Sequence, residues 1–127
     1  MTLSIITINY NNCEGMQKTI KSVLAQTWTS NEWIIIDGGS ADGSCELIER
    51  YHEHFAYCCS GSDKDIYNAM NKGVAVALGE YCLFLNSGDT LCHPDVLAQV
   101  QKAGTDADII CRNAIIHEDS HRRNIAL

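Results

Sequence analysis

Residues 32–44 read EWIIIDGGSADGS, a passage from an apolar run into a glycine-rich turn. Residues 33–36 are rich in β-branched side chains, which is typical of a strand buried on both faces of a parallel sheet. Asp37 ends this strand, and glycines and small polar residues then favour a tight turn. A helix is predicted over residues 44–51. A buried strand that leads through a turn into a helix is the repeating unit of parallel α/β sheets.

The same unit recurs along the chain. Residues 3–9 predict a first strand, and a helix that Asn11 or Asn12 caps follows it and ends near Thr27. Further strands are expected at residues 55–59, 81–85, 108–111 and 114–117. Further helices are expected at residues 65–78, closed by Gly79, and from His93 and Pro94 to Gly104. Gly73 lies inside the first of these helices and predicts close packing or a break there. The alternation predicts an α/β fold with a parallel sheet between helices.

Composition limits the classes of function. The 127 residues fit one domain, and 46% hydrophobic with 20% charged residues is the balance of a globular protein. The formal net charge of −7 argues against a nucleic-acid partner, because phosphate backbones attract basic surfaces. A nucleoside diphosphate needs no basic surface, since one metal ion and a helix N-terminus can hold it.

Cysteine usage and hydropathy indicate a cytoplasmic protein. The chain has seven cysteines, an odd number without Cys-x-x-Cys spacing, and several lie in apolar runs as buried free thiols do. We expect no signal peptide and no transmembrane segment, because no apolar run approaches the roughly 20 residues of a spanning helix. His52 and His54 beside Cys58 and Cys59 have the composition of a zinc site, but the spacing of the histidines disfavours one.

Polar clusters follow three of the predicted strands, at residues 9–12, 37–42 and 86–89. The carboxyl ends of parallel strands meet at one rim, where ligands of such sheets bind, so we expect these clusters to converge. From spacing alone, Asp37 either accepts hydrogen bonds from a base or ribose, or binds its own turn. Asp89 is either an oxygen ligand for Mg²⁺ or Mn²⁺, or a turn residue.

A fourth polar segment precedes the helix at residues 65–78. Asp63, Lys64 and Asp65 lie where backbone N–H groups can hold phosphate, and Lys64 could neutralise diphosphate charge. The alternative is an ordinary helix start with acidic residues in its first turn.

Five strings occur together in one order: SIITINYNN, TIKSVLAQTW, EWIIIDGGSADGS, DKDIYNAMNKGVAVALGEY and FLNSGD, over residues 3 to about 95. In this order and spacing they resemble the inverting family 2 glycosyltransferases. The resemblance implies a GT-A fold with a Rossmann-like, mostly parallel sheet. It also implies a nucleotide-sugar donor, most often a uridine diphosphate sugar, in the setting of polysaccharide assembly.

The resemblance also implies roles for single residues. Tyr10 would lie near the base, Asp37 would help to bind the base or ribose, and Asp63 would line the donor pocket. Asn71 matches the asparagine of the Asn-x-Gly segment of the family. Asp89 would coordinate the Mg²⁺ or Mn²⁺ that bridges the diphosphate.

The sequence departs from the family pattern at three places. Gly38 replaces a second aspartate, Asp65 stands where glycine is usual, and residues 86–89 keep one carboxylate of an Asp-x-Asp-Asp motif. In the family, the base that deprotonates the acceptor belongs to a later, acceptor-binding half. Neither Glu118 nor Asp119 is assigned that role, so the catalytic base and the saccharide or lipid-linked acceptor stay unidentified.

The sequence leaves two other classes of protein as alternatives. One is a catalytically incomplete donor-binding or assembly module that lacks the acceptor half and forms oligomers through an exposed sheet edge. The other is a phospho-acceptor signalling domain, which the sequence disfavours because the strand near Asp108 has no lysine. The expected location is cytoplasmic, with contact at a membrane surface left open.

Overall fold

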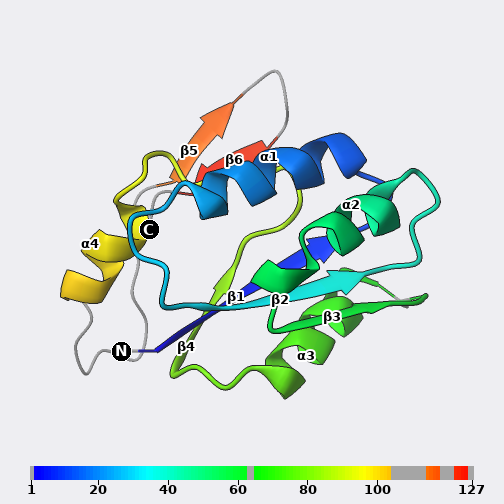
Figure 1. The fold of residues 1–127 in the computed structure, drawn as a ribbon, viewed down its shortest axis with the longest axis horizontal. Coiled ribbons are helices and arrows are strands. Elements are labelled where there is room, and N and C mark those ends of the chain that lie inside the picture. Colours follow the sequence, from blue (N-terminus) through cyan, green and yellow to red (C-terminus); the bar gives the residue numbers. More distant parts are fainter. Residues whose placement is uncertain (1, 63–64, 104–113, 118–121, 126–127) are drawn as a thin grey trace.

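The computed structural model describes residues 2–62, 65–103, 114–117 and 122–125. Strands and helices alternate along most of the chain (Figure 1). The elements are β1 (Leu3–Asn9), α1 (Cys13–Leu24), β2 (Glu32–Asp37), α2 (Ser44–Arg50), the 3-10 helix η1 (His52–His54), β3 (Tyr57–Ser60), α3 (Ile66–Val76), β4 (Tyr81–Phe84), α4 (Val96–Ala103), β5 (Ala114–His117) and β6 (Arg122–Ile125).

Four strands form a parallel sheet in the order β3-β2-β1-β4. The predicted parallel α/β fold is therefore confirmed. The last two strands differ from the prediction, because β5 does not extend this sheet but pairs antiparallel with β6. No strand was predicted at β6, and the strand predicted at residues 108–111 lies outside the described residues. In the register of the sheet, Asn9 at the end of β1 lies beside Asp37 at the end of β2.

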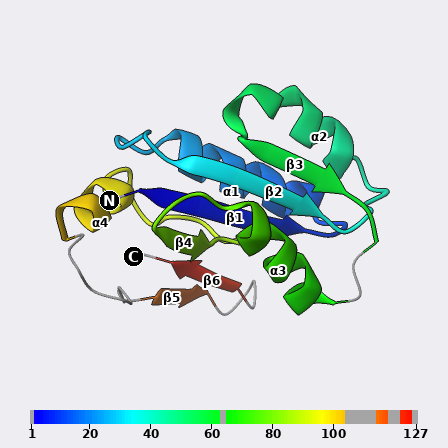
Figure 2. The same ribbon diagram turned by 90° about the horizontal axis from the view of Figure 1, so that it is seen from below.

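Each face of the sheet is apolar and carries helices. Alternate residues of β1 and β2, such as Ile5 and Ile35, pack with α1, α2 and α4 in the larger core cluster. Their neighbours, such as Ile6 and Ile34, pack on the other face with Ala69 of α3. Figures 1 and 2 show α1 and α2 on one side of the sheet and α3 on the other. The period-2 alternation of a strand thus feeds two separate cores.

Two glycines allow the backbone to approach side chains and main chain closely. A Cβ on Gly73 would lie 2.5 Å from Cγ2 of Ile6, which confirms the predicted close packing of α3 on the sheet. The sequence predicts that Gly79 closes α3, but the helix already ends at Val76. A Cβ on Gly79 would instead lie 2.8 Å from the backbone nitrogen of Ser4, so this glycine lets β4 start beside β1.

Other predicted boundaries also shift. Helix α1 ends at Leu24 rather than near Thr27, because the N–H of Thr27 is bonded to the carbonyl of Pro94, 2.9 Å away. Helix α4 begins at Val96, after a turn that contains His93 and Pro94, rather than at Pro94 itself. Its predicted end, Gly104, lies outside the described residues.

The expectation that cysteines in apolar runs are buried was wrong for two strands. Cys58 of β3 and Cys82 of β4 are exposed. Both strands lie at the edges of the parallel sheet, where one side of each strand has no partner strand in the described part of the chain.

We predict that Gly73→Ala destabilises the protein by about 1–3 kcal/mol, because its methyl group must displace Ile6. Helix propensity alone would favour alanine by about 1 kcal/mol, so the sign of the change separates packing from propensity. Urea unfolding measures the free-energy difference. Val74→Ala, at an exposed position of the same helix, is the control and should stay within about 0.5 kcal/mol. A stabilising Gly73→Ala would contradict the close approach.

Candidate functional site

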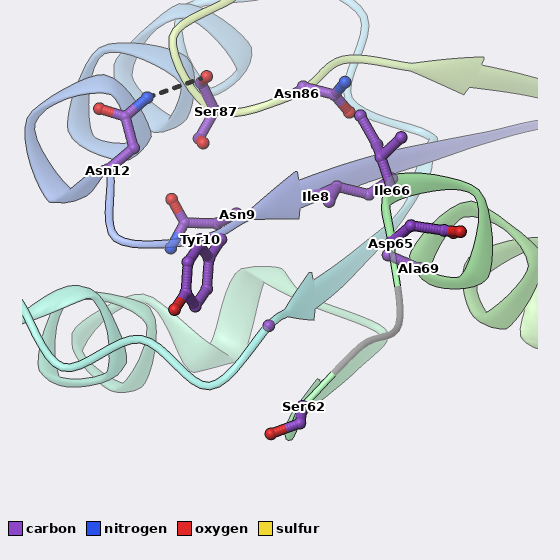
Figure 3. Close-up of a pocket in the computed structure, with 11 residues that line it drawn as sticks. Ile8, Asn9, Tyr10, Asn12, Ser62, Asp65, Ile66, Ala69, Asn86 and Ser87 are labelled. Carbon is purple, nitrogen blue, oxygen red and sulfur yellow. Dashed lines mark hydrogen bonds between the residues drawn. The ribbon is translucent and has the colours of Figure 1, made fainter.

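A cavity of about 430 Å³ lies at the carboxyl ends of β1, β2 and β4, beside the N-terminus of α3 (Figure 3). The residues that line it are Ile8, Asn9, Tyr10, Asn12, Gly38, Ser62, Asp65, Ile66, Ala69, Asn86 and Ser87. Its volume falls within the usual range of small-molecule sites. All three polar clusters contribute residues to its wall, so their predicted convergence on one rim is confirmed.

The first two clusters are joined to each other by hydrogen bonds. The Asn9 amide Nδ2 donates to Oδ1 of Asp37 at 2.8 Å, across the ends of β1 and β2. The backbone N–H of Ala41 donates to Oδ1 of Asn11 at 2.8 Å. The backbone N–H of Cys13 donates to Oδ2 of Asp42 at 2.8 Å. These bonds bind the loop that leads into α1 to the loop that leads into α2, so both loops form one polar frame.

Asp37 is the centre of this frame and is only 1% exposed. Its Oδ1 accepts hydrogen bonds from Asn9 and the Ser40 hydroxyl, at 2.8 and 2.7 Å. Its Oδ2 accepts from the N–H groups of Gly39 and Ser40 and from the Ser60 hydroxyl, at 3.1, 2.9 and 2.8 Å. Burial by itself raises the pKa of Asp37. The hydrogen bonds from Ser40, Asn9 and Ser60 outweigh burial and hold the pKa below its usual value.

The third cluster forms a turn over residues 86–89. The N–H of Asp89 donates to the carbonyl of Asn86 at 2.9 Å, and the N–H of Asn86 donates to Oδ2 of Asp89 at 3.2 Å. Gly88 has φ of +98°, a conformation that favours glycine. Helix α1 holds this turn, because the Asn12 amide donates to the carbonyl of Ser87 at 3.2 Å and the Thr19 hydroxyl contacts Gly88 and Asp89.

The residues that the sequence singled out have different positions relative to the cavity. Tyr10 lines it and is 64% exposed, so its ring is accessible to a ligand. Asp37 and Asp89 adjoin lining residues but are not lining residues themselves. Asn71 is an exposed residue of α3. The buried residues of this helix, which face the sheet, are Ala69 and Gly73. Asp63 and Lys64 lie outside the described residues.

Several lining residues had no role assigned from sequence. Ile66 and Ala69 belong to the face of α3 that turns toward the sheet, and Figure 3 shows them with Asp65 across the cavity from Asn12 and Ser87. Helix periodicity could have suggested that face. Asp65 caps α3, since its side chain accepts a hydrogen bond from the N–H of Asn68 at 2.8 Å.

Oxygen atoms suited to a hard cation are present at the rim. The buried Oδ1 atoms of Asn9 and Asn86 have no hydrogen-bond partner in the described part of the chain. Amide and carboxylate oxygens are the ligands that Mg²⁺ and Mn²⁺ prefer. Within that same part, no three His, Cys, Asp or Glu side chains are grouped as a metal site. The chemistry of Asn86 and Asp89 therefore fits a cation that takes its other ligands from phosphate and water.

Comparison with known proteins identifies relatives of the chain. A family model described as glycosyl transferase family 2 matches residues 4–125. An uncharacterized glycosyltransferase of Mycobacterium tuberculosis is 44% identical over 103 residues, which are 80% of this chain and 39% of the relative. A cholesterol galactosyltransferase of Borreliella burgdorferi is 30% identical over 118 residues, 91% of this chain and 33% of the relative. The chain thus spans about a third to two fifths of the length of these relatives.

Solved structures of glycosyltransferases share the fold. Residues 1–349 of Staphylococcus aureus TarS, in complex with UDP-GlcNAc, superpose with a TM-score of 0.73 at 21% identity, over 80% of this chain and 30% of that TarS chain. The Pyrobaculum calidifontis mannosyltransferase PcManGT, in complex with GDP-Man and Mn²⁺, superposes with a TM-score of 0.71 at 20% identity, over 79% of this chain and 31% of that protein. The predicted GT-A fold is confirmed. Among the described residues, no helix has the length and apolar character needed to cross a membrane.

We predict that the Asp37 charge stabilises the protein fully above about pH 4 and progressively less as the pH falls through its lowered pKa. A group whose pKa is lower in the folded state loses its stabilising effect when it is protonated. Asp37→Asn should therefore lower the free energy of unfolding by about 1–3 kcal/mol at pH 7, and the difference should shrink toward pH 2.5.

Urea unfolding at several pH values measures this difference. Glu53→Gln, at an exposed position of η1, is the control and should follow the wild type at every pH. Parallel curves for wild type and Asp37→Asn between pH 7 and pH 2.5 would contradict the assignment.

Proposed function

The chain belongs to glycosyl transferase family 2, and from this premise we propose that it is the donor-binding part of an inverting, metal-assisted glycosyltransferase. The proposed donor is a nucleotide diphosphate sugar, with a uridine diphosphate sugar as the first candidate. The observation that carries the proposal is the convergence of three polar clusters on one cavity at the carboxyl ends of the strands. Ligands of open α/β sheets bind at this edge.

The base of the donor is proposed to lie against Tyr10. The ring of this residue is exposed at the cavity and offers an apolar face for stacking. Asp37 supports this position indirectly in our proposal, because its carboxylate is already bonded to Asn9 and to the turn that contains Gly38. Gly38 itself lines the cavity, where the absence of a side chain leaves room for base or ribose.

The diphosphate is proposed to lie between the N-terminus of α3 and the turn at residues 86–89. A helix N-terminus carries partial positive charge and suits an anion. Asp63 and Lys64 precede this helix in the sequence, and Lys64 would add a full positive charge. Asn71 keeps its proposed role in donor binding from the family pattern alone.

Asp89 and Asn86 would hold the Mg²⁺ or Mn²⁺ of the donor complex. When bound, such an ion supplies charge stabilisation to the departing diphosphate. The carboxylate of Asp89 contributes the only full negative charge of that pair. In an inverting transfer a base removes the acceptor proton during attack on the anomeric carbon. None of the described residues is assigned as that base.

A second candidate is a donor-binding module without transfer activity. The chain spans 39% or less of the length of the relatives compared above. Such a module would bind the donor and leave its glycosidic bond to the diphosphate intact. Transfer of the sugar from a uridine diphosphate sugar to water or to an added saccharide, with release of uridine diphosphate, would favour the transferase instead.

We predict that uridine diphosphate binds the purified chain and that Mn²⁺ strengthens this binding. Asp89→Ala should reduce the metal-dependent gain in affinity at least about tenfold, because the carboxylate ligand is lost. Isothermal titration calorimetry with and without Mn²⁺ measures both affinities. Asp95→Ala is the matched control, since Asp95 is an exposed aspartate that follows the same turn and does not line the cavity.

The outcomes separate the parts of the proposal. Binding that is absent with and without Mn²⁺ would refute a donor site in this chain. Binding that is equal in wild type and Asp89→Ala would remove Asp89 from the metal site but keep the nucleotide site.

A further inference from the structure

The string TIKSVLAQTW, residues 19–28, covers the second half of helix α1 and the residues that follow it, and the proposed function assigns it no role. The apolar side chains of this helix, such as Met16 and Ile20, are buried in the core. Three polar side chains, Thr19, Ser22 and Gln26, contact the segment of residues 86–97. Helix α1 and the residues just after it therefore carry a polar stripe that binds the chain after β4, about 70 residues away in sequence.

The contacts of this stripe follow the segment in order. The Thr19 hydroxyl contacts the turn at residues 86–89, and the Ser22 hydroxyl accepts a hydrogen bond from the N–H of Leu91 at 2.6 Å. The Gln26 Oε1 accepts from the N–H of Leu97 at 3.0 Å. Of these contacts, those of Thr19 fall on the turn that carries Asp89.

Thr19 is fully buried, and its hydroxyl bridges two consecutive residues of that turn. It accepts a hydrogen bond from the N–H of Gly88 at 2.9 Å and lies 2.7 Å from the carbonyl of Asp89, to which it donates. The carbonyls of Gly15 and Asn86 are farther away, at 3.2 and 3.3 Å. A hydroxyl has one hydrogen, so the shortest contact marks its main acceptor.

This bridge constrains the backbone on both sides of the Asp89 side chain. Gly88 takes its positive φ next to the bonded N–H, and the Asp89 carbonyl is fixed by the hydroxyl. Without the hydroxyl, the half-buried N–H of Gly88 and the carbonyl of Asp89 would both lose a partner. The turn would then relax, and the Asp89 carboxylate would move with it.

We propose that Thr19 is a positioning residue for the donor site, which sets the carboxylate of Asp89 for the cation of the diphosphate. The inference rests on the proposed function, since it needs Asp89 to hold that cation. Thr19 does not line the cavity, so it acts through the turn and not by contact with the donor. Partners of this kind, one step removed from the metal, commonly change metal affinity by about 10–100-fold when they are lost.

The test compares Thr19→Val, Thr19→Ser and Ser22→Ala with the wild type. Valine keeps the shape of threonine without its hydroxyl, and serine restores the hydroxyl. Ser22→Ala removes a side-chain acceptor of a backbone N–H from the same helix, but beyond the turn. The readout is the ratio of the uridine diphosphate dissociation constants without and with Mn²⁺, measured by calorimetry well below the melting temperature of each variant.

We expect Thr19→Val to lower this ratio about tenfold or more, with metal-free affinity little changed. Thr19→Ser should stay within about threefold of the wild type, and Ser22→Ala should match it even if its melting temperature falls. An unchanged ratio in Thr19→Val would overturn the inference, as would an equal loss in Ser22→Ala. If the wild type binds uridine diphosphate without any effect of Mn²⁺, the metal part of the proposed function fails and this inference fails with it. The two failures are distinguishable, because failure of the proposed metal site appears in the wild type, whereas failure of this inference alone appears in the variants.

Discussion

The buried carboxylate of Asp37 is the constraint on which the arrangement of the rim depends. A charged group that is 1% exposed is costly unless its oxygens are bonded, and here they are bonded by three separate segments. Asn9 comes from β1, Gly39 and Ser40 come from the turn after β2, and Ser60 comes from β3. All three segments must be in place for the carboxylate to be satisfied. Formation of the site is thereby coupled to formation of the sheet.

Helix α1 connects this frame to the opposite wall of the cavity. At its N-terminus the N–H of Cys13 is bonded to Asp42, on the side of the frame. Its N-cap residue Asn12 and its buried Thr19 are bonded to the turn at residues 86–89, on the other side. A single helix thus sets the separation of the two walls. A ligand that spans both walls would bind to a preformed site, which lowers the entropic cost of binding.

The sequence predicted the order and type of the elements of the parallel sheet because these depend on local signals. The β-branched runs of β1 and β2, the asparagine at the start of α1 and the internal Gly73 all indicate their structure within a few residues. The ends of α1 and α3 and the start of α4 were not predicted, because contacts distant in sequence determine them. The bond between Thr27 and Pro94 is one such contact. The pairing of β5 with β6 was missed because the tail of the chain has no clear hydrophobic period.

The site shows the same division. Topology alone predicted that the three polar clusters meet, and they do. Topology could not predict which side chains face the cavity, because polar residues at a rim can form hydrogen bonds with one another instead. Asp37 is hydrogen-bonded in this way to the turn that follows it, whereas Tyr10 is exposed at the cavity. The apolar wall formed by Ile66 and Ala69 depends on the angle at which α3 packs, which no local pattern encodes.

The charges around the cavity give a reason why a diphosphate ligand would bring its own cation. Asp65 is the one carboxylate among the described lining residues, and that same set contains no lysine or arginine. A diphosphate placed there would be repelled by Asp65 and attracted by the N-terminus of α3, to which Lys64 would add one positive charge. Asp89 alone, with neutral amide oxygens beside it, would bind a free divalent ion weakly. At this site the ion would supply positive charge to the diphosphate, and the diphosphate would supply negative charge to the ion. We therefore expect the two to bind as one unit.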